Sequence, residues 1–213
     1  MSSENVFYCI WKNYENYKTK FDPNDLDIYI YPNNAYKAFK ILEDNGWLRL
    51  KNPVAEYKNI THYYLFTSRN IYHLHIYIGI RTGDSWLKNY NLPLNDFIKQ
   101  NYYKDKNKIN LLSNDSFHFL FILRTLIKNS TLIGRLLYSN SFQKYKKESE
   151  FIDYKEINYS YKDTLDNNLL DLIKNIECRK INYNNLPNIS ECNKLIRNLR
   201  KYHIFDERFI FFK

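Results

Sequence analysis

Hydrophobic residues in the first part of the chain come in short runs that predict strands. Residues 6–11 are apolar and aromatic, and residues 25–31 form a second such run that stops at a proline. Residues 61–67 and 71–80 are rich in Tyr and Ile and are separated by a short polar turn, which predicts a hairpin. Another strand is expected to begin at residues 47–50.

Between the second run and residue 47 the spacing changes to that of a helix. Asn33 or Asn34 can cap its start, because a short polar side chain accepts hydrogen bonds from the first free amides. Phe39 and Leu42 then recur at helical spacing, and Gly46 is a stop signal. This first part therefore predicts a mixed sheet with helical cover.

From residue 92 onwards helical periodicity dominates. We expect an α+β head over residues 1–93 and a helical domain over residues 94–213. The interval 148–162 is polar and rich in tyrosine, as expected for a long loop. Helices are predicted at residues 94–100, 115–128, 132–146, 164–177 and 190–202.

Composition favours a packed protein and argues against several function classes. The chain has 213 residues, of which 44% are hydrophobic, and a formal net charge of +9. Much of this charge is Lys in a composition typical of an AT-rich genome, and the basic stretches are scattered, so a nucleic-acid partner is not expected. Four glycines are too few for a Walker A loop or a dinucleotide fingerprint, which need closely spaced glycines.

Targeting signals and cysteine frameworks are not expected either. A membrane span would need a run of about 18 apolar residues, which the sequence lacks, and the N-terminus does not resemble a signal peptide. Cys9, Cys178 and Cys192 are widely spread and predict small buried side chains rather than disulfides. The expected localisation is cytoplasmic.

The most informative chemistry is the pair Asp25 and Asp27. Residues two apart on a strand point to the same face, so the two carboxylates project together. Two neighbouring carboxylates repel each other unless a cation lies between them, and Mg²⁺ is a natural occupant because it prefers oxygen ligands. A bare pair of polar residues at the start of a strand is the simpler alternative.

A second pair, His73 and His75, shares a face of the predicted hairpin. Neutral imidazole accepts a proton or binds a metal, whereas two structural histidines on a half-buried sheet are the simpler interpretation. His62 lies near the opposite strand of the hairpin. A zinc site is less favoured, because no third ligand appears at suitable spacing, and His62 is the only candidate for that third ligand.

The first half of the chain resembles the nucleotidyltransferase superfamily of polymerase-β-like folds, in the type found in capsule and surface-polysaccharide clusters. The order of elements around Asp25 and Asp27 carries the resemblance, together with their spacing from the later His-x-His and Gly-Asp-Ser-Trp blocks. The similarity covers residues 6–97. The matching stretches are residues 11–15, 24–30, 73–77 and 81–94.

The resemblance implies transfer of a nucleoside monophosphate from an NTP to a small phosphorylated sugar or polyol, in surface-polysaccharide biosynthesis. Asp25 and Asp27 would hold the cofactor Mg²⁺ against the phosphates, and His75 joins them as a catalytic residue. Association with other glycan-assembly enzymes is a further expectation. The implied substrate-binding residues are Lys12, Glu15, His73, Asp84, Ser85, Trp86 and Lys88.

The chain also departs from the superfamily pattern. The turn before Asp25 has no glycine, and the returning strand carries His73 and His75 where the superfamily has a third carboxylate. Glu15 or Asp84 would be the replacement for that carboxylate. Two alternatives to the enzyme therefore stay open: a catalytically inactive nucleotidyltransferase-like binding module and, less favoured, a nucleic-acid-binding protein.

Overall fold

The computed structural model describes residues 5–13, 26–51, 59–83, 90–92 and 94–128. The chain divides into two compact units, residues 1–80 with 94–113 and residues 81–93 with 114–213. Among the described residues, no helix has both the length and the apolar character needed to cross a membrane.

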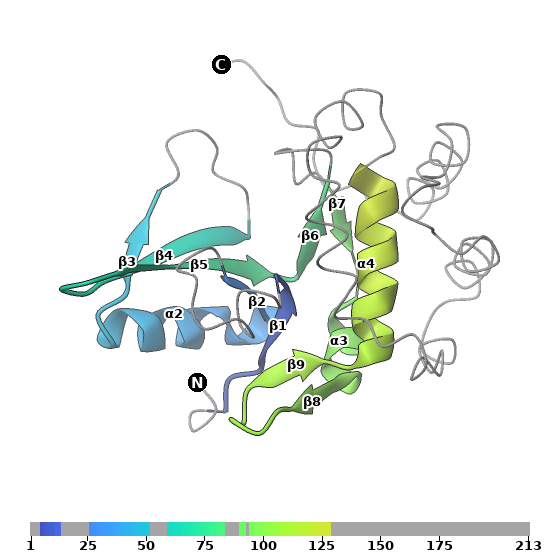
Figure 1. Cartoon of the computed structure of the whole chain (residues 1–213), viewed down its shortest axis with the longest axis horizontal. Coiled ribbons are helices and arrows are strands. Elements are labelled where there is room, and N and C mark those ends of the chain that lie inside the picture. Colours follow the sequence, from blue (N-terminus) through green and yellow to red (C-terminus); the bar gives the residue numbers. More distant parts are fainter. Residues whose placement is uncertain (1–4, 14–25, 52–58, 84–89, 93, 129–213) are drawn as a thin grey trace, which may run out of the picture. The chain divides into compact units, whose positions relative to one another are not determined.

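The first unit is built on one seven-stranded mixed sheet (Figure 1). The parallel pair β2–β5 lies at its centre, and β1 adds to β2 in the antiparallel sense and to β9 in the parallel sense. In spatial order the strands are β3 (Leu48–Leu50), β4 (Ile60–Phe66), β5 (Ile71–Ile78), β2 (Leu26–Ile30), β1 (Tyr8–Lys12), β9 (Asn110–Leu112) and β8 (Tyr102–Lys104).

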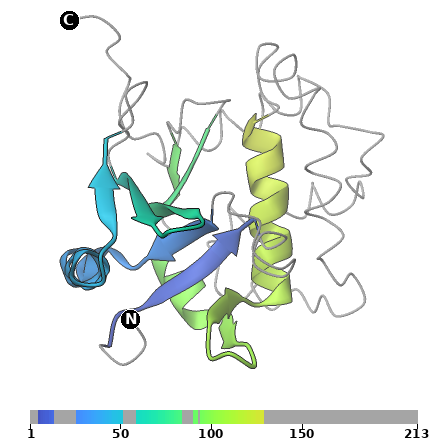
Figure 2. The same cartoon turned by 60° about the vertical axis from the view of Figure 1, so that its left-hand side comes forward.

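Helix α2 (Ala35–Asp44) covers one face of this sheet, as Figure 2 shows with the helix almost end-on. Ala38 and Leu42, one turn apart, pack with residues that alternate along the central strands, such as Ile28 and Ile76. The apolar residues of β2 and β5 thus face the helix. Their alternate neighbours, which include Asp27 and His75, point to the opposite face.

The ends of α2 follow the predicted signals with one difference. The 3₁₀ turn η2 (Pro32–Asn34) leads into the helix, and Asn34 occupies the N-cap without a side-chain capping bond. Its Oδ1 instead accepts a hydrogen bond from the amide of Phe7 at 2.9 Å. Gly46 has φ +81°, and the amides of Gly46 and Trp47 bond the carbonyls of Glu43 and Leu42, which is a Schellman ending.

The structure confirms most of the predicted elements within a few residues. These are the strands at 6–11, 25–31 and 47–50, the hairpin, and the helices at 94–100 and 115–128. The last two are α3 (Asn95–Gln100) and α4 (Asn114–Lys128). Strands β8 and β9 were not predicted: they lie in the stretch that the sequence assigned to the helical domain, yet they extend the sheet. The helices predicted at 132–146, 164–177 and 190–202 lie outside the described residues.

In the second unit the described residues include the helix α4 and the strand β7 (Tyr90–Leu92). Strand β7 pairs with β6 (Ile80–Thr82) in a two-stranded sheet. The mixed α/β content agrees with the predicted class, whereas the helical character of the C-terminal part falls largely on residues that are not described.

Candidate functional site: a polar row across the central strands

A row of polar side chains crosses the sheet on the face opposite α2. Strand register places His62 opposite His75, His75 opposite Asp27, and Asp27 opposite Lys12. The row therefore runs through four neighbouring strands, β4, β5, β2 and β1. Burial increases along it, from partly exposed imidazoles to an aspartate that is only 1% exposed.

Asp27 is the centre of this row and contacts three side chains. Its Oδ1 lies 3.0 Å from Lys12 Nζ and 3.3 Å from His75 Nδ1. Its Oδ2 accepts a hydrogen bond from the side-chain amide of Asn13. A buried carboxylate is stable only when it is paired and hydrogen-bonded, and Asp27 meets both conditions.

These contacts determine the protonation state of Asp27. Burial alone would raise the pKa of the carboxyl group, but the ion pair with Lys12 and the contact with His75 outweigh it and hold the pKa well below its ordinary value. Asp27 is therefore an anion throughout the physiological range. A fixed negative charge beside His75 favours the imidazole tautomer that carries its proton on Nδ1.

Lys12 reaches Asp27 because of an irregularity in β1. The β1–β2 register shifts between Ile10 and Lys12, which places Lys12 directly opposite Asp27. Its ammonium also donates to the Tyr77 hydroxyl at 2.8 Å and lies 5.0 Å from the centre of the Trp11 ring. The lysine is thus held by a carboxylate, a phenol and an aromatic face, and only 8% of it is exposed.

Three histidines gather at the more open end of the row. His62 Nδ1 lies 3.1 Å from His73 Nε2, and the ring of His75 is edge-on to both, at 4.4 and 4.5 Å between ring centres. One ring nitrogen from each of the three lies within 4.8 Å of the others. The ring of Tyr64 stacks on His73 at 4.2 Å and fixes its plane.

Four of the predicted site residues lie in the described part of the chain. Asp27 contacts both Lys12 and His75, and His73 joins them through the ring of His75. The remaining six predicted residues lie outside the described residues: Asp25, Glu15, Asp84, Ser85, Trp86 and Lys88.

The structure adds Asn13 and Tyr77 to the site and brings in His62, which the sequence offered only as a zinc alternative. The sequence could have predicted Tyr77, because it lies two residues after His75 and therefore on the same face of the strand. The sequence gives less indication that Asn13 belongs to the site. It adopts φ +57°, a conformation that asparagine tolerates better than most residues, directly after Lys12.

Asp27, a predicted Mg²⁺ ligand, already has a partner on each carboxylate oxygen in this arrangement. An ammonium lies against Oδ1, and an amide donates to Oδ2. Asp25, the other expected ligand, lies outside the described residues, so magnesium binding stays a prediction.

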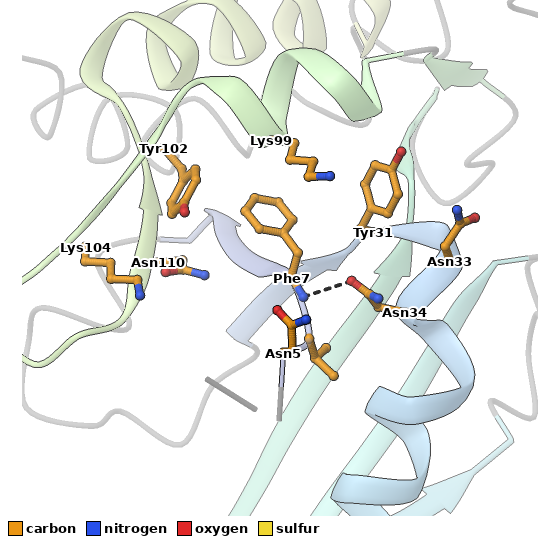
Figure 3. Close-up of a pocket in the computed structure, with 10 residues that line it drawn as sticks. Asn5, Phe7, Tyr31, Asn33, Asn34, Lys99, Tyr102, Lys104 and Asn110 are labelled. Carbon is orange, nitrogen blue, oxygen red and sulfur yellow. Dashed lines mark hydrogen bonds between the residues drawn. The ribbon is translucent and has the colours of Figure 1, made fainter. Parts of the chain in front are cut away.

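A separate pocket of about 510 Å³ lies at the other end of β1 and β2 (Figure 3). Phe7 and Tyr31 line it, with the ammonium of Lys99 lying 5.1 Å from the centre of the Tyr31 ring. Tyr31 directly follows β2 and is four residues from Asp27, or roughly 13 Å at 3.3 Å per residue. The pocket therefore contains none of the predicted site residues.

Comparison of the chain with protein-family models, with curated proteins and with solved structures gives no match.

Proposed function

We propose that the protein is a nucleotidyltransferase-like enzyme. It transfers a nucleoside monophosphate from an NTP, supplied as its Mg²⁺ complex, to a small phosphorylated sugar or polyol in the cytoplasm, for surface-polysaccharide biosynthesis. The observation that supports this most is the contact between Asp27 and His75. It joins the Asp-x-Asp strand to the His-x-His strand on which the resemblance depends.

The contact gives His75 a chemical role. Asp27 accepts a hydrogen bond from Nδ1–H and stabilises the positive charge that develops on the ring when Nε2 takes a proton. For a hydroxyl acceptor, the oxygen attacks the α-phosphorus, the bond from that phosphorus to the bridging oxygen breaks, and pyrophosphate leaves. The hydroxyl proton passes to His75 Nε2.

Lys12 acts on this reaction through Asp27. Buried against Tyr77 and Trp11, Lys12 keeps the Asp27 carboxylate ionised and fixes the position of that carboxylate beside His75. It is therefore a positioning residue, and its removal should act mainly through the orientation and basicity of His75. His73, stacked on Tyr64 beside His75, is proposed to contact the acceptor.

The test is pyrophosphate release from each NTP in the presence of Mg²⁺ and a panel of sugar phosphates and polyol phosphates. Asp27→Asn should lower kcat, by about the 10²- to 10⁴-fold that general acid–base catalysis contributes. His203→Gln serves as a matched control, because it removes a histidine that has no place in the proposal. Turnover by Asp27→Asn equal to that of the wild type would remove the mechanism.

A second candidate, a catalytically inactive binding module, is favoured by one observation. Asp27 is only 1% exposed and both of its oxygens are engaged, so it offers little to an incoming phosphate or metal. This candidate predicts saturable NTP binding by calorimetry without pyrophosphate release for any acceptor. Turnover with a single acceptor would exclude it.

A further inference from the structure

The three histidines of the β4–β5 hairpin form a compact set of nitrogen ligands. His62 projects from β4, and His73 and His75 project from β5 on the same face of the sheet. The two strands pair regularly from Ile60 to Phe66, so the positions of these side chains are fixed by the backbone. A site on paired strands is held more rigidly than one on a loop.

The spacing of the nitrogens is close to that of a metal centre. Zinc–imidazole bonds of about 2.0–2.1 Å in a tetrahedron separate the nitrogens by about 3.3–3.4 Å. The nitrogens of His62 and His73 lie 3.1 Å apart, and all three ligand nitrogens lie within 4.8 Å of one another. Small side-chain rotations would bring the widest separation into this range.

Asp27 supplies the outer partner that metal-bound histidines usually have. It lies against Nδ1 of His75, which leaves Nε2 of that ring as the ligand atom. A carboxylate behind a ligating imidazole fixes the tautomer and raises the basicity of the ligand. The carboxylate is buried and held by Lys12 and Asn13, so its position behind His75 is fixed.

We propose that His62, His73 and His75 bind one divalent transition-metal ion of the zinc class, with Asp27 orienting His75. Three imidazoles select zinc and similar ions over Mg²⁺, which prefers oxygen ligands. Three protein ligands leave a fourth tetrahedral position for water or a small molecule, as in catalytic rather than structural zinc sites. The rings are partly exposed, so an ion can reach them.

The metal site stands independently of the proposed transfer, but the two share one atom. Nε2 of His75 cannot accept a proton while it ligates a metal. Zinc is therefore expected to suppress transfer, and a metal-free protein is the active form if both proposals hold.

The experiment is a Zn²⁺ titration of the full chain by calorimetry without nucleotide. The protein is purified without a polyhistidine tag and freed of metal by chelation. One ion should bind per chain, and Co²⁺ should give the absorption of a tetrahedral complex. Asp27→Asn should weaken binding by about 10- to 100-fold, the usual effect of losing an outer partner, and His62→Gln and His73→Gln should weaken it further. His203→Gln should leave it unchanged.

A cysteine at position 62 keeps the test informative if the glutamine variants fail to fold. His62→Cys should retain Co²⁺ and add a thiolate-to-cobalt charge-transfer band, because the new ligand is a sulfur atom. The proposal is overturned if the wild type shows no saturable binding, or if folded His62→Gln and His73→Gln bind as tightly as the wild type. Because no nucleotide is present, failure of the transfer reaction has no bearing on this result.

Discussion

The Lys12 ammonium lies 3.0 Å from Asp27 Oδ1, and both side chains lie at the buried end of the polar row. Replacing Lys12 with Met would leave the carboxylate buried without its counter-ion. Loss of one partner of such a pair costs about 3–5 kcal/mol, so Lys12→Met should lower the free energy of unfolding by that amount. Urea denaturation followed by circular dichroism measures it.

The matched control for this prediction is Lys99→Met. Lys99 is exposed and makes a cation–π contact with Tyr31, so its replacement should change stability by less than about 1 kcal/mol. The double variant Lys12→Met/Asp27→Asn, in which no charge is left unpaired, should be more stable than Lys12→Met alone. If Lys12→Met is as stable as Lys99→Met, the ion pair has no structural role.

Tyr29 gives a prediction about alkaline pH. Its hydroxyl donates to Asn95 Oδ1 at 2.9 Å, and burial, followed by the nearby Tyr31 and Asp96, raises its pKa. The unfolded chain loses the phenolic proton near pH 10, about its ordinary pKa, whereas the folded protein keeps it. The stability contributed by neutral Tyr29 is therefore complete below pH 10 and declines above it.

The comparison of wild type with Tyr29→Phe tests this sign. Near neutral pH the variant should be less stable by about 0.5–1.5 kcal/mol, because one hydrogen bond is lost. Above pH 10 the difference should shrink, since the variant has no phenol to ionise at this position. Urea denaturation at a series of pH values measures it, and a difference that widens with pH would contradict the account.

Cys9 is expected to be unreactive in the native protein. The residue is fully buried in β1, and burial raises the pKa of its thiol well above the ordinary value. Because the thiolate is the nucleophile, alkylation at mildly alkaline pH should require the sheet to open. Peptide mapping after iodoacetamide treatment should show slow labelling of Cys9 in buffer and fast labelling in urea; equal rates would contradict this burial.

Strong local signals explain the parts of the fold that the sequence predicted. Helix α2 carries an asparagine at its start and Gly46 at its end, and the hairpin has two long runs separated by a short turn. Each of these features is set by residues close together in the chain. Backbone preferences are enough to locate such elements.

Strands β8 and β9 carry no comparable signal. Each has only three residues, and β8 is exposed along its whole length, so neither shows a pattern of alternating burial. They form because β9 pairs with β1, where Leu111 lies opposite Ile10, a residue far away in the sequence. A pairing between residues so far apart cannot be predicted from a short stretch of sequence.

The candidate site shows the same limit. A spacing of two residues correctly placed His73 and His75 on one face of a strand, and His62 was expected near the opposite strand. Strand register, which places Asp27 between His75 and Lys12, is a property of the assembled sheet. The register shift in β1 that directs Lys12 to Asp27 has no sequence signature. The sequence therefore predicted that Lys12 contacts the substrate, whereas in the structure it pairs with Asp27.

The central claim is that the Asp27–His75 pair performs nucleotidyl transfer. A single-turnover assay with metal-free protein, Mg²⁺ and an NTP labelled on the α-phosphate tests it most directly, by following the label into the acceptor. The wild type and His203→Gln should transfer the label at equal rates, and His75→Gln should be slower by about 10²- to 10⁴-fold. Transfer by folded His75→Gln at the wild-type rate would contradict the account.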